Sequence, residues 1–287
     1  MTGIRLAEIA KRQAEIGDEL LKLNKLEQEI NQKVNKTLTP ARDDKEKVLD
    51  KNRINEIIEQ LALQVISAYE LDQGGEAPLL VTLMDGALFV TCDLIRSLAA
   101  KGHSLNYTSL TSSSYSGTTR GEVKLGQTKA SVCGRNVLLV DELVDSGKTA
   151  ELAISQMRAQ HVTDVKFLAL LNKMPENADI KRRELVDFCG AEINPDAFIV
   201  GCGLDYSNSF RGKDGIYDVN TAYIATDEES AQLKQRNAFS IELTKLDTEK
   251  QDLLKLESSQ RPTHSNSFFT SGHATSPAQP IEYTYFS

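Results

Sequence analysis

The chain has 287 residues, of which 40% are hydrophobic and 26% are charged, so it is long enough to bury a sizeable core. Its 33 basic and 41 acidic residues give a formal net charge of −8, which argues against generic binding to nucleic acid or to a membrane surface. No apolar run approaches the roughly 20 residues of a membrane span, and the first residues lack the apolar core of a secretion signal.

The positions of the cysteines and histidines indicate the redox compartment and the kind of metal site to expect. Cys92, Cys133, Cys189 and Cys202 are scattered without paired spacing, so we expect reduced thiols and a cytoplasmic location. The four histidines show no ligand spacing, so none of them is assigned to a metal.

The chain begins with a long amphipathic pattern. Residues 1 to about 38 place Ile9, Ile16, Leu23 and Ile30 at seven-residue intervals, which predicts a helix with an apolar stripe for a partner helix. The Thr39-Pro40 pair ends this pattern. We therefore expect an N-terminal helical extension over residues 1–40.

The main domain is expected over residues 41–222 and opens with a second amphipathic helix. A strand over residues 79–84 then ends in a tight turn at Asp85-Gly86-Ala87, where the glycine lets the backbone approach a ligand closely. Residues 113–124 are polar and contain glycine, and they lie between strand-like runs. Such a composition suits a mobile lid over a site.

The most informative stretch covers residues 136–149. The β-branched, apolar run Val137–Val140 is typical of a strand in the middle of a parallel sheet. Asp141 and Glu142 follow at its carboxyl end, where side chains of open α/β sheets face a ligand. Residues 145–149 then turn into a helix, whose first free backbone N–H groups make an anion site.

Two other interpretations of this stretch are open. Gly147-Lys148-Thr149 looks like part of a P-loop for nucleoside triphosphates, but that motif needs a glycine five positions before Gly147, where Glu142 stands. A carboxylate there would repel the phosphates. A strand-turn-helix corner with solvated acids is the other possibility.

The second half of the chain carries one more strand and a specific string. The strand Leu168–Leu171 is followed by Lys173, and the run from Pro195 to Arg211 reads PDAFIVGCGLDYSNSFR. A helical segment from about Glu228 to Ser258 could pair with residues 1–38, form an oligomer contact or remain solvated. We expect a C-terminal helical extension over residues 223–258 and a disordered tail over 259–287.

These segments resemble a known family. The two acids, two apolar residues and Asp-Ser-Gly-Lys-Thr of residues 141–149 are similar to the phosphoribosyl diphosphate signature of the type I phosphoribosyltransferases. Residues 79–89, 113–124 and 168–211 look like segments of the hypoxanthine-guanine branch, in its order. The resemblance covers roughly residues 45 to 218. It implies an α/β fold with a parallel sheet flanked by helices and a small hood.

The resemblance also implies roles for individual residues. Asp145 would be the catalytic general acid or base, Asp205 would bind the metal, and Mg²⁺ would be the cofactor. The lid would carry Ser114 and Tyr115. Phosphoribosyl diphosphate would be bound by Asp85, Gly86, Asp141, Glu142, Ser146, Gly147, Lys148, Thr149 and Arg211.

The purine would be bound by Lys173, Phe198 and Ile199. A cation at Lys173 can donate to a purine 6-oxo group, whereas adenine would leave it unpaired, so a 6-oxopurine is favoured. Phe198 would stack on the base, with the backbone of Ile199 reading its edge. The alternatives are that Phe198 belongs to the core, and that Lys173 and Lys148 are solvated.

The sequence departs from the family pattern in three places. The second acid is Glu142, one methylene longer than the usual aspartate, and Asp85 stands where many members of the branch carry a lysine or arginine. No arginine follows Pro175 directly, and the register of Arg182 or Arg183 as a substitute is open. An acid near the diphosphate could weaken its binding unless only the backbone contacts it.

The expected reaction joins hypoxanthine or guanine to phosphoribosyl diphosphate and releases diphosphate, as in purine salvage. A homodimer or homotetramer is expected, as is common in the family, and the tails could bind an unknown protein. A catalytically weak nucleotide sensor acting through its extensions is the alternative. An enzyme delivered into another system by its tails is a third. The choice among hypoxanthine, guanine and xanthine stays open.

Overall fold

The computed structural model describes residues 2–43, 48–114, 123–175, 184–219 and 224–259. Residues 260–287 of the expected tail, Tyr115, Arg182 and Arg183 lie outside these residues. The described residues form two compact units, one of residues 24–233 and one of residues 2–23 with 234–259.

The larger unit contains a six-stranded sheet of order β4-β3-β2-β5-β6-β7. Its strands are β2 (Leu79–Met84), β3 (Tyr107–Ser114), β4 (Val123–Thr128), β5 (Asn136–Val144), β6 (Asp164–Asn172) and β7 (Phe188–Glu192). Only β4 is antiparallel to its neighbour among these strands. From β2 the chain first adds β3 and β4 on one side of the sheet and then returns to add β5, β6 and β7 on the other. A topological switch point therefore lies between β2 and β5, and ligands bind at such points in open α/β sheets.

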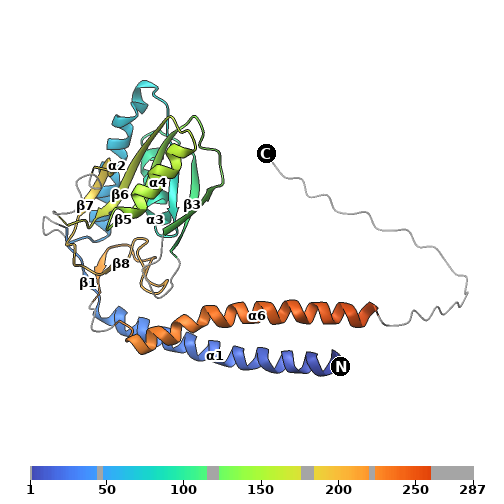
Figure 1. Ribbon diagram of the computed structural model, residues 1–287. Helices are drawn as coiled ribbons and strands as arrows, with labels where there is room; N and C mark the ends of the chain where they lie inside the picture. The colour runs from blue at the N-terminus through green and yellow to red at the C-terminus, as the bar shows by residue number, and fades with distance from the viewer. Residues whose placement is uncertain (1, 44–47, 115–122, 176–183, 220–223, 260–287) are drawn as a thin grey trace, which may run out of the picture. The chain divides into compact units, whose positions relative to one another are not determined.

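Helices cover both faces of this sheet (Figure 1). They are α2 (Lys51–Ala68), α3 (Leu88–Ala100) and α4 (Lys148–Ala159), and a short 3-10 helix, η1 (Leu71–Gln73), follows α2. Alternate residues of β5 point to opposite faces: Leu138 and Val140 pack with α2 and α3, whereas Val137 and Leu139 pack with α4. All four are fully buried, which confirms the predicted central strand.

A small second sheet forms the hood, with the order β1-β9-β8. It consists of β1 (Thr39–Pro40), β8 (Ile199–Val200) and β9 (Tyr217–Asp218), all antiparallel. Thr39-Pro40 was expected only to end a helix, whereas the pair forms an edge strand of the hood. The predicted α/β fold with flanking helices and a hood is confirmed.

The two longest helices described are α1 (Thr2–Thr37) and α6 (Asp227–Ser259). In the smaller unit they pair as an antiparallel coiled coil, which we call the arm: Arg5 pairs with Glu249 and Arg12 with Glu242, each at 2.7 Å. Ile9 and Ile16 are buried in the seam. Among the three arrangements that the sequence left open for residues 228–258, the structure has the pairing with the N-terminal helix.

A polar layer interrupts the apolar seam of the arm. Gln13 occupies a seam position and donates through Nε2 to Asp247 Oδ1 at 2.7 Å, while its Oε1 accepts from Lys250 Nζ at 3.5 Å. A single polar residue in such a seam fixes the register of the two helices. The exposed ion pairs beside it match the same register and add little stability of their own.

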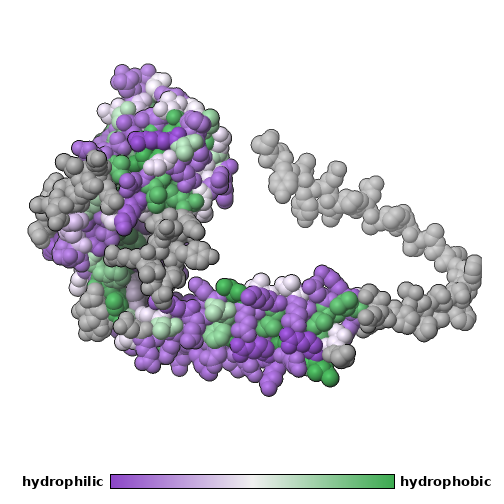
Figure 2. Space-filling model, in the orientation of Figure 1, coloured by the Kyte–Doolittle hydropathy of each residue, from purple (hydrophilic) through white to green (hydrophobic). Residues whose placement is uncertain are grey.

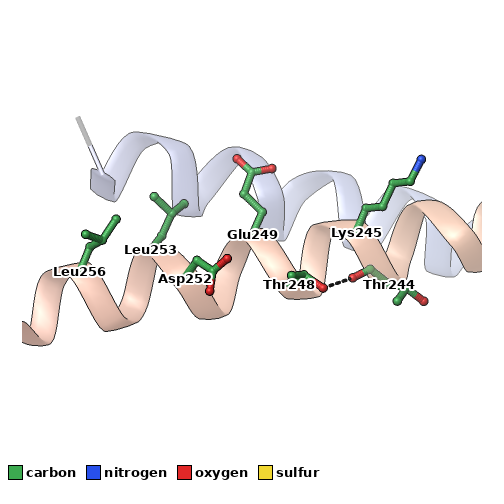
Figure 3. A pocket seen from close by; sticks show the side chains of 7 residues that line it. All are labelled: Thr244, Lys245, Thr248, Glu249, Asp252, Leu253 and Leu256. Atoms are coloured by element: carbon green, nitrogen blue, oxygen red, sulfur yellow. Dashed lines mark hydrogen bonds between the residues drawn. The ribbon is translucent and has the colours of Figure 1, made fainter.

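The outer surface of the arm is largely hydrophilic on its visible face, with separate apolar patches (Figure 2). A groove on α6 is lined by Thr244, Lys245, Thr248, Glu249, Asp252, Leu253 and Leu256 (Figure 3). Its lining mixes charges of both signs with two leucines, which gives it no clear ligand chemistry. None of the described helices is apolar enough along its length to cross a membrane.

Candidate active site

Two adjoining cavities lie at the carboxyl ends of β2 and β5. The larger, of about 370 Å³, falls within the range of small-molecule sites. Its lining comes from three segments far apart in the sequence: Leu83, Met84, Asp85, Gly86, Asp141, Glu142, Leu143, Thr149, Leu204, Asp205, Asn208 and Arg211. The smaller cavity is lined by Asp141, Leu143, Val144, Asp145, Ser146, Gly147, Thr149 and Ala150.

The smaller cavity sits at the start of α4. Gly147 precedes this helix with a φ of +74°, a conformation that glycine adopts without strain. No side chain caps the helix, so its N-terminal N–H groups are open to a ligand. Asp145 and Ser146 are exposed at the rim. The arrangement offers an anion site beside an available carboxylate.

Asp141, which is buried, and Glu142, which is half-buried, form an acidic pair at the two cavities. Burial raises the pKa of Asp141 well above its usual range, and the neighbouring charge of Glu142 adds to this effect. Burial also raises the pKa of Glu142, although Arg211 acts in the opposite direction. Asp141 Oδ1 accepts the backbone N–H of Glu142 at 2.9 Å. The site thus holds two adjacent carboxyl groups whose ionised forms are disfavoured mainly by burial.

The backbone approaches these acids closely at two glycines. A β-carbon added to Gly86 would collide with the carboxylate of Glu142, and one added to Gly203 would collide with the carbonyl oxygen of Gly86. Gly203 also has a φ of +100°. The turn after β2 is therefore packed between the acidic pair and the hood.

The hood contributes Asp205 and Arg211 to the larger cavity. Arg211 Nη2 contacts Asp205 Oδ1 at 2.7 Å, and Arg211 Nη1 donates to the carbonyl oxygen of Gly203 at 2.7 Å. Asp205 Oδ2 accepts the backbone N–H of Asn208 at 2.7 Å. These bonds orient both charged groups before any ligand arrives.

The larger cavity carries four carboxylates and one cation among its lining residues. Asp85, Asp141, Glu142 and Asp205 outnumber Arg211, so an anionic ligand needs additional positive charge. Carboxylate oxygens are hard ligands that suit Mg²⁺, which usually keeps several waters and binds through one or two carboxylates plus phosphate oxygens. No group of three or more acidic, histidine or cysteine ligands gathers within the described ranges. The donor set fits a magnesium ion shared with a bound phosphate compound.

The residues expected to bind a base lie outside both cavities. Lys173, at the end of β6, is half-buried, and its backbone N–H donates to the carbonyl oxygen of Val144 at 2.8 Å. Phe198 is 37% exposed, so it does not belong to the core, and its ring meets that of Tyr206 edge to face with centroids 6.1 Å apart. Ile199 is buried in β8.

The remaining predicted residues are Lys148, Ser114 and Tyr115. Lys148 is exposed and does not line either cavity. Ser114 ends β3, but its side chain, like the whole of Tyr115, lies outside what the structure describes. Asn208 also lines the larger cavity and was not among the predicted residues, although its position inside the specific string of residues 195–211 was a usable signal.

An α/β sheet with an acidic pocket and an open helix N-terminus at its switch point defines a class of proteins that bind phosphorylated sugars or nucleotides. Residues 44–207 match the family model described as the phosphoribosyl transferase domain. The chain therefore belongs to the phosphoribosyltransferase family, in its type I, hypoxanthine-guanine branch.

The alignments with relatives of this branch cover most of each relative's length. Hypoxanthine-guanine phosphoribosyltransferase of Bacillus subtilis is 33% identical over 171 residues, which are 58% of this chain and 89% of that protein. Hypoxanthine-guanine-xanthine phosphoribosyltransferase of Tritrichomonas foetus is 29% identical, with 61% and 92% covered. A crystal structure of the Bacillus anthracis hypoxanthine-guanine enzyme superposes with a TM-score of 0.52 at 27% identity, covering 63% of this chain and all of that one.

Proposed function

We propose that this protein is a purine-salvage phosphoribosyltransferase that joins a 6-oxopurine to phosphoribosyl diphosphate. The bond between a purine ring nitrogen and C1′ forms while the bond from C1′ to the diphosphate oxygen breaks. The observation that carries this proposal is that Asp141, Glu142, Asp205 and Arg211 converge on one cavity beside the open N-terminus of α4.

The two cavities divide the sugar phosphate between them. The 5′-phosphate binds at the start of α4, through the backbone N–H groups from Ser146 to Thr149 and the hydroxyls of those two residues. The ribose hydroxyls lie against Asp141 and Glu142, which both line the larger cavity. Gly86 lets backbone atoms reach the diphosphate.

The diphosphate leaves from the hood side of the larger cavity. Arg211 supplies a fixed cation there, and Asp205 is the carboxylate that would hold the magnesium ion. A bound Mg²⁺ neutralises charge on the leaving diphosphate. Burial raises the pKa values of Asp141 and Glu142, so a metal-bound substrate with a developing positive charge on its sugar would favour their ionised forms.

Asp145 is the proposed proton carrier. Its exposed carboxyl lies on the loop between the acidic pair and the anion site, so it is placed beside the sugar rather than at the leaving group. It would accept the proton that the purine ring nitrogen loses when the new bond forms. Proton transfer of this kind is worth about 10²–10⁴-fold in rate.

The base site is completed by Lys173, Phe198 and Ile199, with Ser114 and Tyr115 on the lid. The partly exposed ring of Phe198 offers a stacking surface, and its edge contact with Tyr206 sets its orientation. Lys173 can donate to a 6-oxo group. Choice among hypoxanthine, guanine and xanthine would then depend on contacts at the 2-position.

We also propose that the enzyme acts in the cytoplasm as a homodimer or homotetramer. All four cysteines are free thiols, as expected in a reducing compartment. The Trypanosoma cruzi relative has been studied for the effect of its C-terminal region on oligomeric state and activity. The relatives are named as enzymes, which favours catalysis over a silent nucleotide sensor.

A panel of bases tests the proposed chemistry. Purified protein is incubated with phosphoribosyl diphosphate, Mg²⁺ and one of hypoxanthine, guanine, xanthine or adenine, and the nucleoside monophosphate is separated by chromatography. We expect product with at least one 6-oxopurine and none with adenine. The Lys173→Met variant should lose about tenfold or more in kcat/KM for the 6-oxopurine, because the donor to its oxygen is gone. Equal use of adenine and hypoxanthine by both forms would refute this base assignment.

A further inference from the structure

The turn that carries the diphosphate-binding residues has an unfavourable backbone conformation. Ser207, Asn208 and Phe210 have φ values of +50°, +61° and +73°, although none of them is a glycine. Non-glycine residues in this region persist only where surrounding contacts hold them. The turn lies between Asp205 and Arg211, so whatever holds it also determines where these two charges sit.

Contacts inside the turn account for part of its order. Tyr206 and Ser209 exchange backbone hydrogen bonds of 3.2 and 3.0 Å, and Asn208 donates its N–H to Asp205 Oδ2. These bonds fold the turn upon itself. They do not fix it relative to the rest of the hood.

Gly203 and Arg211 tie the end of the turn to the hood backbone, and helix α1 supplies a further contact from outside the hood. Asn31 Nδ2 donates to Ser209 Oγ at 2.7 Å, across a separation of 178 residues in the sequence. On the same side of α1, Ile30 and Val34 are buried together with Val200 and Val219 of the hood. All of these residues belong to the larger compact unit.

The same apolar cluster reaches both ends of the turn. Tyr206 and Phe210 pack against it, so the helix and the turn share a core as well as a hydrogen bond. Tyr206 also accepts the backbone N–H of Ala225 through its hydroxyl at 2.6 Å and meets the ring of Phe198. Helix α1 therefore lies behind the hood surface that would face the substrate.

The side chain of Asn31 carries a desolvation cost at this position. Its Oδ1 is buried and has no hydrogen-bond partner among the described residues, so the side chain gives up solvation for one bond to Ser209. An apolar residue would fill the cluster without that cost. The polar side chain thus serves the position of the turn rather than the stability of the cluster.

We propose that Asn31 is a positioning residue through which helix α1 holds the turn at residues 206–209 in its diphosphate-binding conformation. The family match covers residues 44–207, so α1 lies outside it and this support is an addition to the matched domain. The kinetic part of the inference rests on the proposed function. Its structural part, that α1 orders the turn, does not.

The kinetic test separates substrate binding from turnover. In the full-length protein, Asn31→Ala should raise the KM for phosphoribosyl diphosphate about fivefold, as expected for one lost hydrogen bond, with kcat changed less than about twofold. Asn35→Ala is the matched control, because Asn35 is exposed one turn further along the same helix. An unchanged KM in Asn31→Ala would overturn the proposal.

The partner residue provides a second arm. Ser209→Ala should reproduce the effect of Asn31→Ala, and the double variant should be no worse than either single one, because both remove the same bond. Ser209→Thr keeps the acceptor oxygen and should restore most of the affinity. Additive effects of the two alanine variants would show that they act independently and would overturn the assignment.

Hydrogen exchange tests the structural part without any turnover. The backbone amides of Tyr206, Asn208 and Ser209 should exchange about fivefold faster in Asn31→Ala than in the wild type or in Asn35→Ala. If the wild type makes no nucleotide from any purine, the proposed function fails while faster exchange would still support the role of α1. Unchanged exchange in Asn31→Ala would refute that role whatever the activity.

Discussion

The carboxylate of Glu142 lies directly against the α-carbon of Gly86, and no β-carbon fits between them. Gly86→Ala must therefore displace the carboxylate of Glu142. A misplacement of about 1 Å in a catalytic site costs about 10²-fold, so kcat/KM should fall by that order. Gly17→Ala is the control, since a β-carbon there meets nothing within 4 Å, and steady-state kinetics compares the two. Wild-type activity in Gly86→Ala would show that Glu142 does not need its present position.

Asp145→Asn should lower kcat by about 10²–10⁴-fold, because the amide cannot take up the proton from the purine. The KM for phosphoribosyl diphosphate should change little, since the anion site at the start of α4 remains. Asp145 is exposed, so the variant should unfold at the wild-type temperature. A kcat within about threefold of the wild type would mean that another group carries the proton.

Asp141→Asn should raise the stability of the fold and lower the activity. Burial raises the pKa of Asp141, so the folded protein keeps a proton that the unfolded chain releases near its ordinary value of about 3.9. Stability therefore falls as the pH rises from about 4 through the raised pKa of the folded state, and the loss is complete above it.

The asparagine does not titrate, so Asp141→Asn should remove this fall. Its unfolding temperature above neutral pH should rise by about 2–4 °C for each 1 kcal/mol gained. Its kcat/KM should drop by about 10²-fold, because an amide cannot ionise to place a negative charge beside the sugar in the transition state. Calorimetry across the pH range checks the first effect and kinetics the second. A lower unfolding temperature would show that the carboxyl stabilises the fold.

Asp85 adds a negative charge to a cavity that is proposed to bind a diphosphate. Asp85→Lys should lower the KM for phosphoribosyl diphosphate by about three- to tenfold, a modest effect because the side chain is exposed and screened. Asp85→Asn should fall between the two forms, and the differences should shrink as salt is added. An unchanged or higher KM in Asp85→Lys would mean that the side chain does not influence the diphosphate.

Much of the site could be predicted because it lies at strand ends. The apolar run of β5 predicted that Asp141 and Glu142 lie at the carboxyl end of a central strand. Parallel strands bring their carboxyl ends to one edge of the sheet, so Gly86, which follows β2, was expected near these two acids. The glycine-containing loop before α4 could be predicted because it also follows the carboxyl end of β5. In these segments, local pattern and tertiary position agree.

Other features depend on contacts that leave no local pattern. Thr39-Pro40 is too short to show strand periodicity, and it becomes a strand only because β9 lies beside it. The heptad pattern of α1 continues without a break past Leu23, although the helix changes partners there, from the arm to the hood. The bond between Asn31 and Ser209 joins positions that no spacing rule relates.

The most direct measurement is magnesium-dependent release of diphosphate from phosphoribosyl diphosphate in the presence of hypoxanthine or guanine, with the wild type and Asp145→Asn in parallel. We expect release that requires both the purine and Mg²⁺ and that falls by about 10²-fold or more in the variant. A folded wild-type protein that binds nucleotide but releases no diphosphate with any purine would contradict the assignment as an enzyme and favour a nucleotide sensor.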